Sequence, residues 1–244
     1  MKSQSIRRVG IAIVSLLVAA LIGFFYLGYL SSDPFTTIRP TAPARRDVAA
    51  IILSGDMGFR VGMGPQIAKR LTADGIPVVG VNSLSYFRTT RTPAEATALL
   101  TTAIGKADAA FHPRRLILIG QSFGADMLHV ALAGLAPDLR RNIAMVALIV
   151  PGATVEFRAS PSEIFTFAMN EEPAWPTAKR IDWVPLLCVY GREESASLCP
   201  LLHQANAHVV GLPGGHPLHY NSTAVYRQLT DAMRRSGVET TTHS

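Results

Sequence analysis

The chain has 244 residues, 48% of them hydrophobic and 16% charged, which is enough for one globular domain with a sizeable core. Its formal net charge is +6, but six of the 23 basic residues and only one of the 17 acidic residues fall within the first 46 positions. The remainder is nearly neutral and holds only short pairs of basic residues, which argues against a nucleic-acid partner.

The N-terminal segment, residues 1–30, is predicted to be a transmembrane anchor. After Arg7 and Arg8, residues 9–30 contain no charged side chain, and a helix of this length matches the hydrocarbon thickness of a bilayer. Basic residues before this stretch and none close behind it predict a cytoplasmic N-terminus and a periplasmic body at the bacterial inner membrane. We expect the anchor to be uncleaved; the alternative is a cleaved signal that releases a periplasmic protein.

Beyond this segment, residues 31–46 are rich in Pro, Thr and Ser without an apolar period, which predicts a linker. Short apolar runs then alternate with longer amphipathic stretches. Strands are predicted at 48–53, 78–81, 116–119, 145–150, 186–190 and 209–212. Helices are predicted around 67–71, at 93–110 and near 201; two further helices follow the strands 116–119 and 209–212 and end at residues 135 and 235. Since the strands are apolar on both faces, we expect one doubly wound α/β domain with a mostly parallel sheet over residues 47–236, and a disordered tail at 237–244.

The motif Gly-Gln-Ser-Phe-Gly, residues 120–124, stands between the predicted strand 116–119 and an amphipathic helix. In such sheets, reactive residues gather in the loops beyond the carboxyl ends of the strands. Glycines on both sides of the serine permit a tight strand-to-helix turn that exposes its hydroxyl, the nucleophile elbow. Ser122 is therefore the candidate nucleophile. The alternative is a serine that caps the helix after a glycine turn.

A catalytic serine needs a base to take its proton, and an elbow enzyme carries its acid and then its histidine later in the chain. Both residue types follow in this order, just past predicted strand ends. His216 is the candidate base, and His219 is its nearest rival. As the acid we favour Glu194, because it has room to turn back toward the histidine; Glu193 and Asp182 are the alternatives.

Two further loops are candidates for contact with a substrate. Backbone N–H groups of Phe123 and of Asp56 or Met57 are the predicted oxyanion hole, although the glycine-rich segment at Asp56 reads equally as an ordinary turn. The loop 82–91 mixes aromatic and basic side chains, which predicts either a site for an anionic headgroup or a solvated loop. The binding candidates in this loop are Tyr86, Arg88 and Arg91.

Residues 157–183 are too irregular for a strand–helix unit and contain several aromatic side chains, so they form either a lid over an apolar substrate or part of the core. Cys188 and Cys199 lie in the part expected outside the membrane, where a disulfide persists and would fix the loop that carries Glu194. Two buried thiols are the alternative. Without close histidine partners the cysteines do not form a zinc site, and no metal or cofactor is expected.

Taken together, several segments resemble the VirJ family of bacterial virulence proteins, which includes the VirJ-like domain of AcvB. They are residues 55–59 (GDMGF), 79–87 (VGVNSLSYF), 91–93 (RTP), 118–126 (LIGQSFGAD), 188–194 (CVYGREE), 199–200 (CP) and 212–216 (LPGGH). The resemblance covers about residues 48–233. It implies an α/β-hydrolase fold with Ser122, Glu194 and His216 as the triad and with cysteines at both positions found here.

The same resemblance implies a periplasmic serine hydrolase acting on aminoacylated phospholipid, notably lysyl-phosphatidylglycerol, with a link to type IV secretion and DNA transfer to plants. The chain departs from the family at Met57, Phe59, Gln121 and Pro217, where glycine, tryptophan, tyrosine and histidine are usual, and these positions bear on substrate preference. The expected partners are therefore a lipid-like ester, the inner membrane and secretion-system components. A non-catalytic assembly factor that uses the fold as a binding platform is the alternative.

Overall fold

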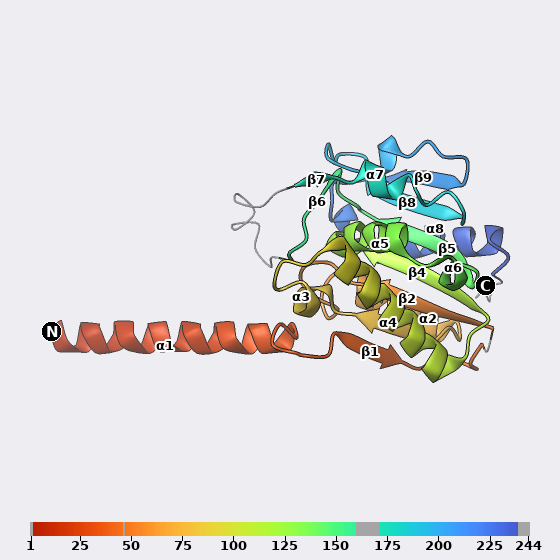
Figure 1. Cartoon of the computed structure of the whole chain (residues 1–244). Coiled ribbons are helices and arrows are strands. Elements are labelled where there is room, and N and C mark those ends of the chain that lie inside the picture. Colours follow the sequence, from red (N-terminus) through yellow and green to blue (C-terminus); the bar gives the residue numbers. More distant parts are fainter. Residues whose placement is uncertain (1, 46, 160–170, 239–244) are drawn as a thin grey trace.

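A seven-stranded sheet forms the centre of the domain in the computed structural model, which describes residues 2–45, 47–159 and 171–238 (Figure 1). Its strand order is β1-β3-β2-β4-β5-β8-β9. The strands are β1 (Phe35–Ile38), β2 (Val48–Leu53), β3 (Val78–Val81), β4 (Arg115–Gln121), β5 (Ile143–Ile149), β8 (Leu186–Gly191) and β9 (Ala207–Leu212). Neighbouring strands are parallel except β1, which is antiparallel to β3, so the predicted mostly parallel sheet is confirmed.

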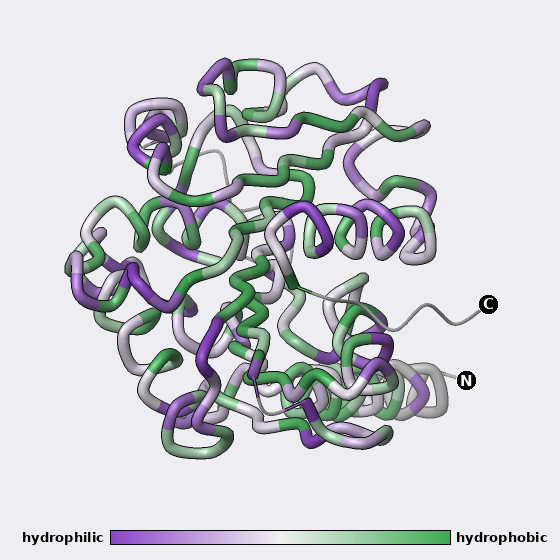
Figure 2. Tube along the Cα trace, turned by 90° about the vertical axis from the view of Figure 1, so that its right-hand side faces the viewer, coloured by the Kyte–Doolittle hydropathy of each residue, from purple (hydrophilic) through white to green (hydrophobic). Residues whose placement is uncertain are grey.

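Helices cover both faces of this sheet, because the side chains of each buried strand alternate between two apolar layers. In β2, for example, Ile51 joins the layer beneath α4 (Pro93–Phe111) and α5 (Phe123–Gly134), whereas Ile52 joins the other layer. That second layer lies beneath α2 (Gly64–Ala73) and α8 (Ser222–Arg235). Figure 2 shows the hydrophobic stretches concentrated in the central strands. The doubly wound arrangement predicted for the domain is therefore confirmed.

The remaining elements are short and lie in the connections, apart from the long N-terminal helix α1 (Lys2–Tyr26). They are α3 (Ser83–Tyr86), α6 (Pro137–Arg140), β6 (Thr154–Val155), β7 (Glu172–Pro173), α7 (Trp175–Ala178), η2 (Cys199–Leu201) and η3 (Leu218–Tyr220). Among the longer helices, α4 begins with a reciprocal cap in which Thr92 and Glu95 satisfy each other's backbone N–H groups. This cap fixes the start of a helix that packs along α5.

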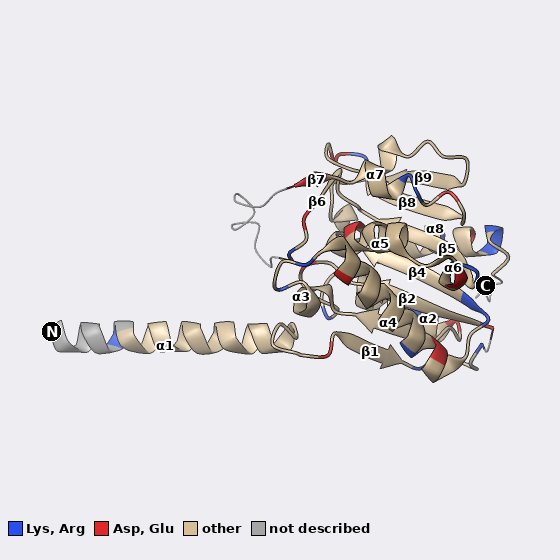
Figure 3. Ribbon diagram, in the orientation of Figure 1, with Lys and Arg blue, Asp and Glu red and all other residues tan. Residues whose placement is uncertain are grey.

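The helix α1 projects away from the body of the protein (Figure 1), and its large apolar side chains are exposed. Leu16 and Phe25, for instance, are 73% and 75% exposed. Figure 3 shows the described part of α1 almost free of charged residues. Among the residues described here, no helix is long and apolar enough to cross a membrane, so the predicted span is not confirmed.

The prediction of a linker over residues 31–46 is wrong for four of these residues, which form the edge strand β1. Phe35 to Ile38 pair with β3 in an antiparallel register that runs from Phe35–Val81 to Ile38–Val78. Only the two end residues of β1 are partly buried, and its two threonines are exposed. Backbone pairing rather than side-chain burial therefore defines this strand, which explains why it lacks an apolar period.

The described parts of the segment 157–183 pack on the domain. Phe157, Trp175 and Trp183 are partly buried against the α4–α5 layer, which favours the core interpretation for these residues. On either side of the undescribed stretch, β6 and β7 form a two-stranded antiparallel sheet. Phe165, Phe167 and Met169 lie outside the described residues, and this part of the predicted lid lies there with them.

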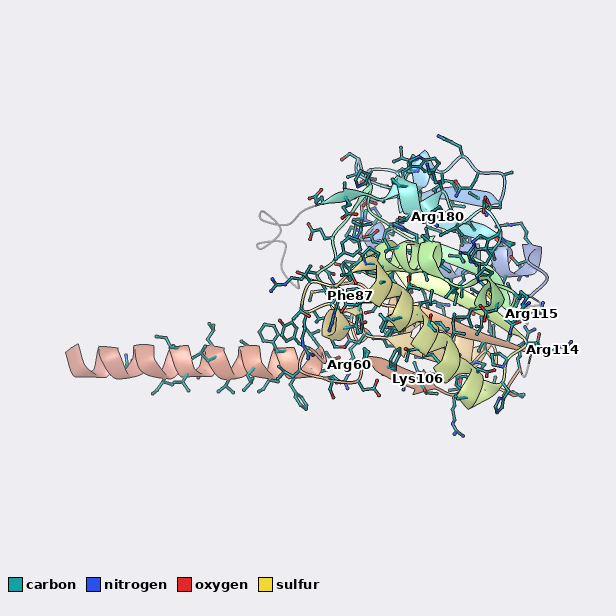
Figure 4. All side chains as sticks on the ribbon, viewed as in Figure 1. Arg60, Phe87, Lys106, Arg114, Arg115 and Arg180 are labelled. Carbon is teal, nitrogen blue, oxygen red and sulfur yellow. A yellow bond between two sulfur atoms is a disulfide. The ribbon has the colours of Figure 1, made fainter. Side chains whose placement is uncertain are left out.

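Arg115, at the start of β4 (Figure 4), ties the residue before β2 to the segment after α8. Its guanidinium donates to the Asp47 carboxylate at 2.6 Å and to the Gly237 carbonyl at 2.7 Å. The next residue, Val238, is fully buried in the α2–α8 layer. The predicted disordered tail therefore does not begin at residue 237, and residues 239–244 lie outside the described part.

Candidate active site

Ser122 occupies a sharp turn between β4 and α5. Its backbone has φ 52° and ψ −128°, a conformation that non-glycine residues rarely adopt and that costs on the order of 1–3 kcal/mol. The surrounding structure holds this turn, because the Ser122 N–H donates to the Ile149 carbonyl of the neighbouring strand at 2.8 Å. The predicted elbow geometry is thus present, with the serine side chain placed at the carboxyl end of the sheet.

The glycines of the motif are required by close backbone contacts rather than by their own dihedral angles. A side chain at Gly120 would collide with the backbone of Gly124 and Ala125, and one at Gly124 would collide with the carbonyls of Leu53 and Ser54. The elbow therefore lies directly against the end of β2. This contact brings the loop that follows β2 beside the nucleophile.

Ser122, His216 and Glu194 form one hydrogen-bonded relay. The Ser122 Oγ lies 2.8 Å from His216 Nε2, and His216 Nδ1 lies 2.6 Å from Glu194 Oε1. The histidine side chain is 46% exposed, whereas that of the glutamate is only 12% exposed. With the Nδ1–H donated to the carboxylate, Nε2 is left as the proton acceptor for the serine hydroxyl. The structure thus brings the three predicted triad residues together.

The loops after β8 and β9 explain why Glu194, and not Glu193, faces the histidine. The Glu193 N–H donates to the Gly214 carbonyl, and its side-chain Oε1 accepts the Gly214 N–H, each at 3.1 Å. Glu193 therefore joins the two loops and leaves Glu194 to reach His216. The rival histidine, His219, lies in η3 with a left-handed backbone and takes no part in the relay.

A disulfide closes the loop that carries the acid. Cys188, in β8, is bonded to Cys199, at the start of η2, and both are fully buried. The loop between them also pairs with the segment after β5, through the Ala153 N–H to the Ala196 carbonyl and a bridge between Gly152 and Ser197. The predicted disulfide is confirmed, and with these contacts it restrains the backbone around Glu194.

The predicted oxyanion elements lie beside Ser122. Phe123 is the first residue of α5, and the fully buried Phe87, labelled in Figure 4, packs edge-on against its ring, with the two centroids 5.2 Å apart. Asp56 and Met57 are the central residues of a turn closed by the Gly58 N–H to the Gly55 carbonyl. A side-chain carbon at Gly55 would lie 3.6 Å from the Ser122 Cβ. The oxyanion role of these residues stays a prediction.

The three binding candidates in loop 82–91 line one surface pocket and also make contacts within the fold, and their binding role stays a prediction. The Arg88 guanidinium donates to the carbonyls of Tyr29 and Ser31, in the segment that follows α1. Arg91 forms an ion pair with Glu95 at 2.8 Å and stacks on the ring of Tyr86. These contacts serve the local fold, and none of them includes a member of the triad.

One acidic residue near the triad was not singled out from the sequence. Asp126 follows Ser122 by one turn of α5, and its Oδ1 accepts the Gly152 N–H at 2.9 Å. Burial raises the pKa of Asp126 well above its usual range, and the negative charges of Glu194, Asp56 and Glu156 add to this effect, although the Gly152 hydrogen bond opposes it. Its spacing of four residues from the nucleophile is the signal that would have pointed to it.

Gln121, which departs from the usual tyrosine of the family, has a structural role here. Its side-chain Oε1 accepts the N–H of Gly64, the first residue of α2, at 2.8 Å. A side-chain carbon at Gly62 would lie only 2.9 Å from the Gln121 amide nitrogen. Gln121 therefore connects the elbow to the far end of the loop between β2 and α2.

Within the described chain, no three His, Cys, Asp or Glu side chains are grouped as metal ligands would be.

The parallel sheet, the elbow and the Ser-His-Glu relay together define a domain with the α/β-hydrolase fold. Residues 47–237 match the sequence model of the family described as bacterial virulence protein (VirJ), and the chain belongs to this family. A comparison with curated protein sequences finds no match.

Solved structures support the fold at low sequence identity. Est1E from Butyrivibrio proteoclasticus aligns over 84% of this chain and 94% of its own, with a TM-score of 0.63 and 13% identity. An α/β serine hydrolase without a lid from Xanthomonas campestris aligns over 82% and 88%, with a TM-score of 0.54 and 19% identity. MenH from S. aureus aligns over 83% and 98%, with a TM-score of 0.59 and 11% identity.

Proposed function

We propose that this protein is a serine hydrolase that cleaves a carboxylic ester. The observation that carries the proposal is the continuous relay from the Ser122 hydroxyl through His216 to the Glu194 carboxylate, at 2.8 and 2.6 Å. The serine oxygen attacks the ester carbonyl while His216 Nε2 accepts its proton, and Glu194 stabilises the imidazolium that forms. The proton then passes to the leaving alcohol, and the acyl group stays bound to Ser122 as an ester. Water attacks this ester while His216 accepts its proton, and the proton passes to the Ser122 oxygen as the free acid leaves.

The oxyanion of the tetrahedral intermediate is assigned to the backbone N–H of Phe123 together with that of Asp56 or Met57. This assignment is supported by the place of Phe123 at the start of α5 and by the turn at Gly55, which borders Ser122. Among the solved structures with this fold, Est1E is bound to ferulic acid in one, and the Pyrococcus furiosus protein Pf2001 is an esterase. Ester cleavage is therefore a reaction that the fold accommodates.

As the substrate we propose an aminoacylated phospholipid such as lysyl-phosphatidylglycerol. Membership in the VirJ family supports this choice, and so does the acidic surrounding of the triad. Asp56 and Glu156 lie close enough to the buried Asp126 for their charges to act on it, and their carboxylates offer a favourable field for a cationic aminoacyl group. The ester between the amino acid and the glycerol hydroxyl would be the bond that is cleaved.

A direct test uses the full chain in detergent micelles that contain lysyl-phosphatidylglycerol. Wild-type protein is expected to release free lysine and phosphatidylglycerol, and a fluorophosphonate probe is expected to label it. Ser122→Ala should abolish both signals while the protein stays folded. Folded wild type that neither takes the label nor releases lysine would overturn the proposal.

We also propose that the domain works on the periplasmic side of the bacterial inner membrane, with α1 attaching it there. The exposed apolar side chains of α1 and the disulfide between Cys188 and Cys199 support this location. Membrane fractionation and protease treatment of spheroplasts would test it, and a soluble or protease-protected domain would contradict it. If Ser122→Ala, at a normal protein level, restored secretion to a deletion strain, a binding role toward secretion components would replace the hydrolytic one.

A further inference from the structure

A cavity lies at the base of α1, away from the triad. It has a volume of about 620 Å³ and is enclosed by the end of α1, the segment that leads into β1, the loop after β2, and α2. None of Ser122, His216 and Glu194 lines it. The volume falls within the range of about 300–1,000 Å³ that is typical of pockets for small ligands.

The lining of this cavity combines an apolar wall with an excess of positive charge. Ile38 and Phe59 contribute to the apolar part, whereas Arg60 and Lys69 bring two cationic side chains, both exposed. Within the described chain, neither of these cations forms an ion pair. The one acidic residue of the lining, Asp33, already accepts the N–H of Phe35 at 3.0 Å.

The position of the cavity indicates where its ligand comes from. Tyr26, the last residue of α1, lines the cavity and lies beneath the Arg60 guanidinium, 5.5 Å from the ring centroid. Figure 4 shows Arg60 at the point where α1 meets the body. Tyrosine and arginine at the end of an apolar helix are typical of the headgroup level of a bilayer. A protein held by α1 would therefore have this cavity at the membrane surface.

We propose that this cavity binds an anionic phospholipid, distinct from the ester that the triad cleaves. The phosphate pairs with Arg60 and Lys69, and the upper part of an acyl chain lies against Ile38 and Phe59. Cationic side chains at a membrane surface select anionic headgroups, and the apolar wall adds contacts that free phosphate lacks. The proposal rests on the membrane location given under the proposed function but not on hydrolysis.

The lipid site is also connected to the active-site loop. Phe59 follows directly on the turn that holds Asp56 and Met57, and a side chain at Gly58 would collide with the Leu27 carbonyl at the end of α1. A lipid in the cavity therefore contacts the far side of the loop that borders Ser122.

The experiment uses the full chain with Ser122→Ala in neutral detergent, so that no turnover occurs, and follows the midpoint of thermal unfolding. Short-chain phosphatidylglycerol is expected to raise the midpoint, whereas phosphatidylcholine of the same chain length and inorganic phosphate are not. The pair Arg60→Gln with Lys69→Gln should weaken phosphatidylglycerol binding at least tenfold. Thr36→Trp, which fills the cavity from the exposed face of β1 and keeps both charges, should weaken it as well.

The matched control is Lys179→Gln with Arg180→Gln, which removes the same charge from exposed positions far from α1 (Figure 4). It should bind phosphatidylglycerol like the parent. An equal response to phosphatidylcholine, an equal response to inorganic phosphate, or unchanged binding by both cavity variants would each overturn the lipid site. Lipid binding by a wild type without hydrolytic activity would instead refute only the proposed hydrolase function.

Discussion

The two sides of the Ser122 site are built in different ways. On the acid–base side, a disulfide and reciprocal backbone hydrogen bonds restrain the loops of Glu194 and His216. On the other side, the loop from Ser54 to Met63 is held by its glycines, by Gln121 and by the end of α1. The hydrogen-bonded relay therefore depends on the C-terminal half of the sheet, whereas the loop predicted to bind the oxyanion depends on how the N-terminal segment docks.

The largest effect is expected from breaking the relay at its acid. Glu194→Gln should lower kcat by roughly 10⁴-fold, because an amide neither holds the reactive histidine tautomer nor stabilises the imidazolium. Steady-state hydrolysis of a soluble ester such as p-nitrophenyl acetate measures this change. The matched control, Glu193→Gln, should cost less than about tenfold, since its side chain only accepts the Gly214 N–H. Equal losses in the two variants would contradict the separation of roles.

The next largest effect is expected from a buried histidine on α5, the helix that begins directly after Ser122. His129 is fully buried on this helix, its Nδ1 bonds to the Thr177 hydroxyl at 2.8 Å, and burial lowers its pKa from 6.5 to about 3. Below pH 6.5 the unfolded chain therefore binds a proton that the folded protein does not. Stability is lost as pH falls from 6.5 toward 3, by on the order of 4 kcal/mol over the whole window.

Urea unfolding at a series of pH values tests this dependence. His129→Leu should show a flatter decline below pH 6.5 than wild type, whatever its absolute stability. The raised pKa of Asp126 acts in the opposite direction in both proteins and cancels in the comparison. Parallel curves for the two proteins would mean that His129 is protonated in the folded state.

The disulfide gives the third expected effect. Replacing Cys188 and Cys199 by alanine removes a cross-link over a sequence separation of 11 residues, which should lower the free energy of unfolding by about 3 kcal/mol. Labelling of Ser122 by a fluorophosphonate should also slow, because the loop of Glu194 gains freedom. Reduced wild type serves as the reference and should match the double variant. Unchanged labelling would show that hydrogen bonds alone hold the acid.

The smallest effect is expected on the N-terminal side. Arg88→Gln removes the hydrogen bonds to the carbonyls of Tyr29 and Ser31, and the local opening of residues 27–34 should become easier by about 1 kcal/mol. Proteolytic cleavage in this segment should therefore accelerate about fivefold. Arg114→Gln, at an exposed position before β4, is the control and should leave cleavage unchanged.

Much of the fold could be predicted because its strands are buried on both faces. The runs that became β2 and β3 are continuously apolar, and they occupy the predicted ranges. The edge strand β1 could not be predicted in this way, since its side chains are half exposed and its pairing uses only the backbone. An apolar period in the sequence indicates which side chains are buried, and few side chains of an edge strand are buried.

The triad could be predicted because chain order and strand ends together constrain where an acid and a base can lie. The sequence already favours Glu194 over Glu193, and the Gly214 hydrogen bonds give the physical reason, which no local pattern encodes. Asp126 lies four residues after Ser122, but its partner Gly152 lies 26 residues away, so the sequence does not show their contact. The predicted binding role of the arginines in loop 82–91 stays a prediction: Arg88 also holds the N-terminal segment, and Arg91 pairs with Glu95.

The contact of Arg115 with both Asp47 and Gly237 has a consequence for the connectivity of the domain. Because residues 47 and 237 meet at one side chain, the region between them, which holds every strand of the seven-stranded sheet except β1, has its two ends close together. This closeness favours a circular permutant in which residue 237 is joined to residue 47 and new ends open elsewhere. In such a permutant β1 would need its own connection to the edge of the sheet beside β3.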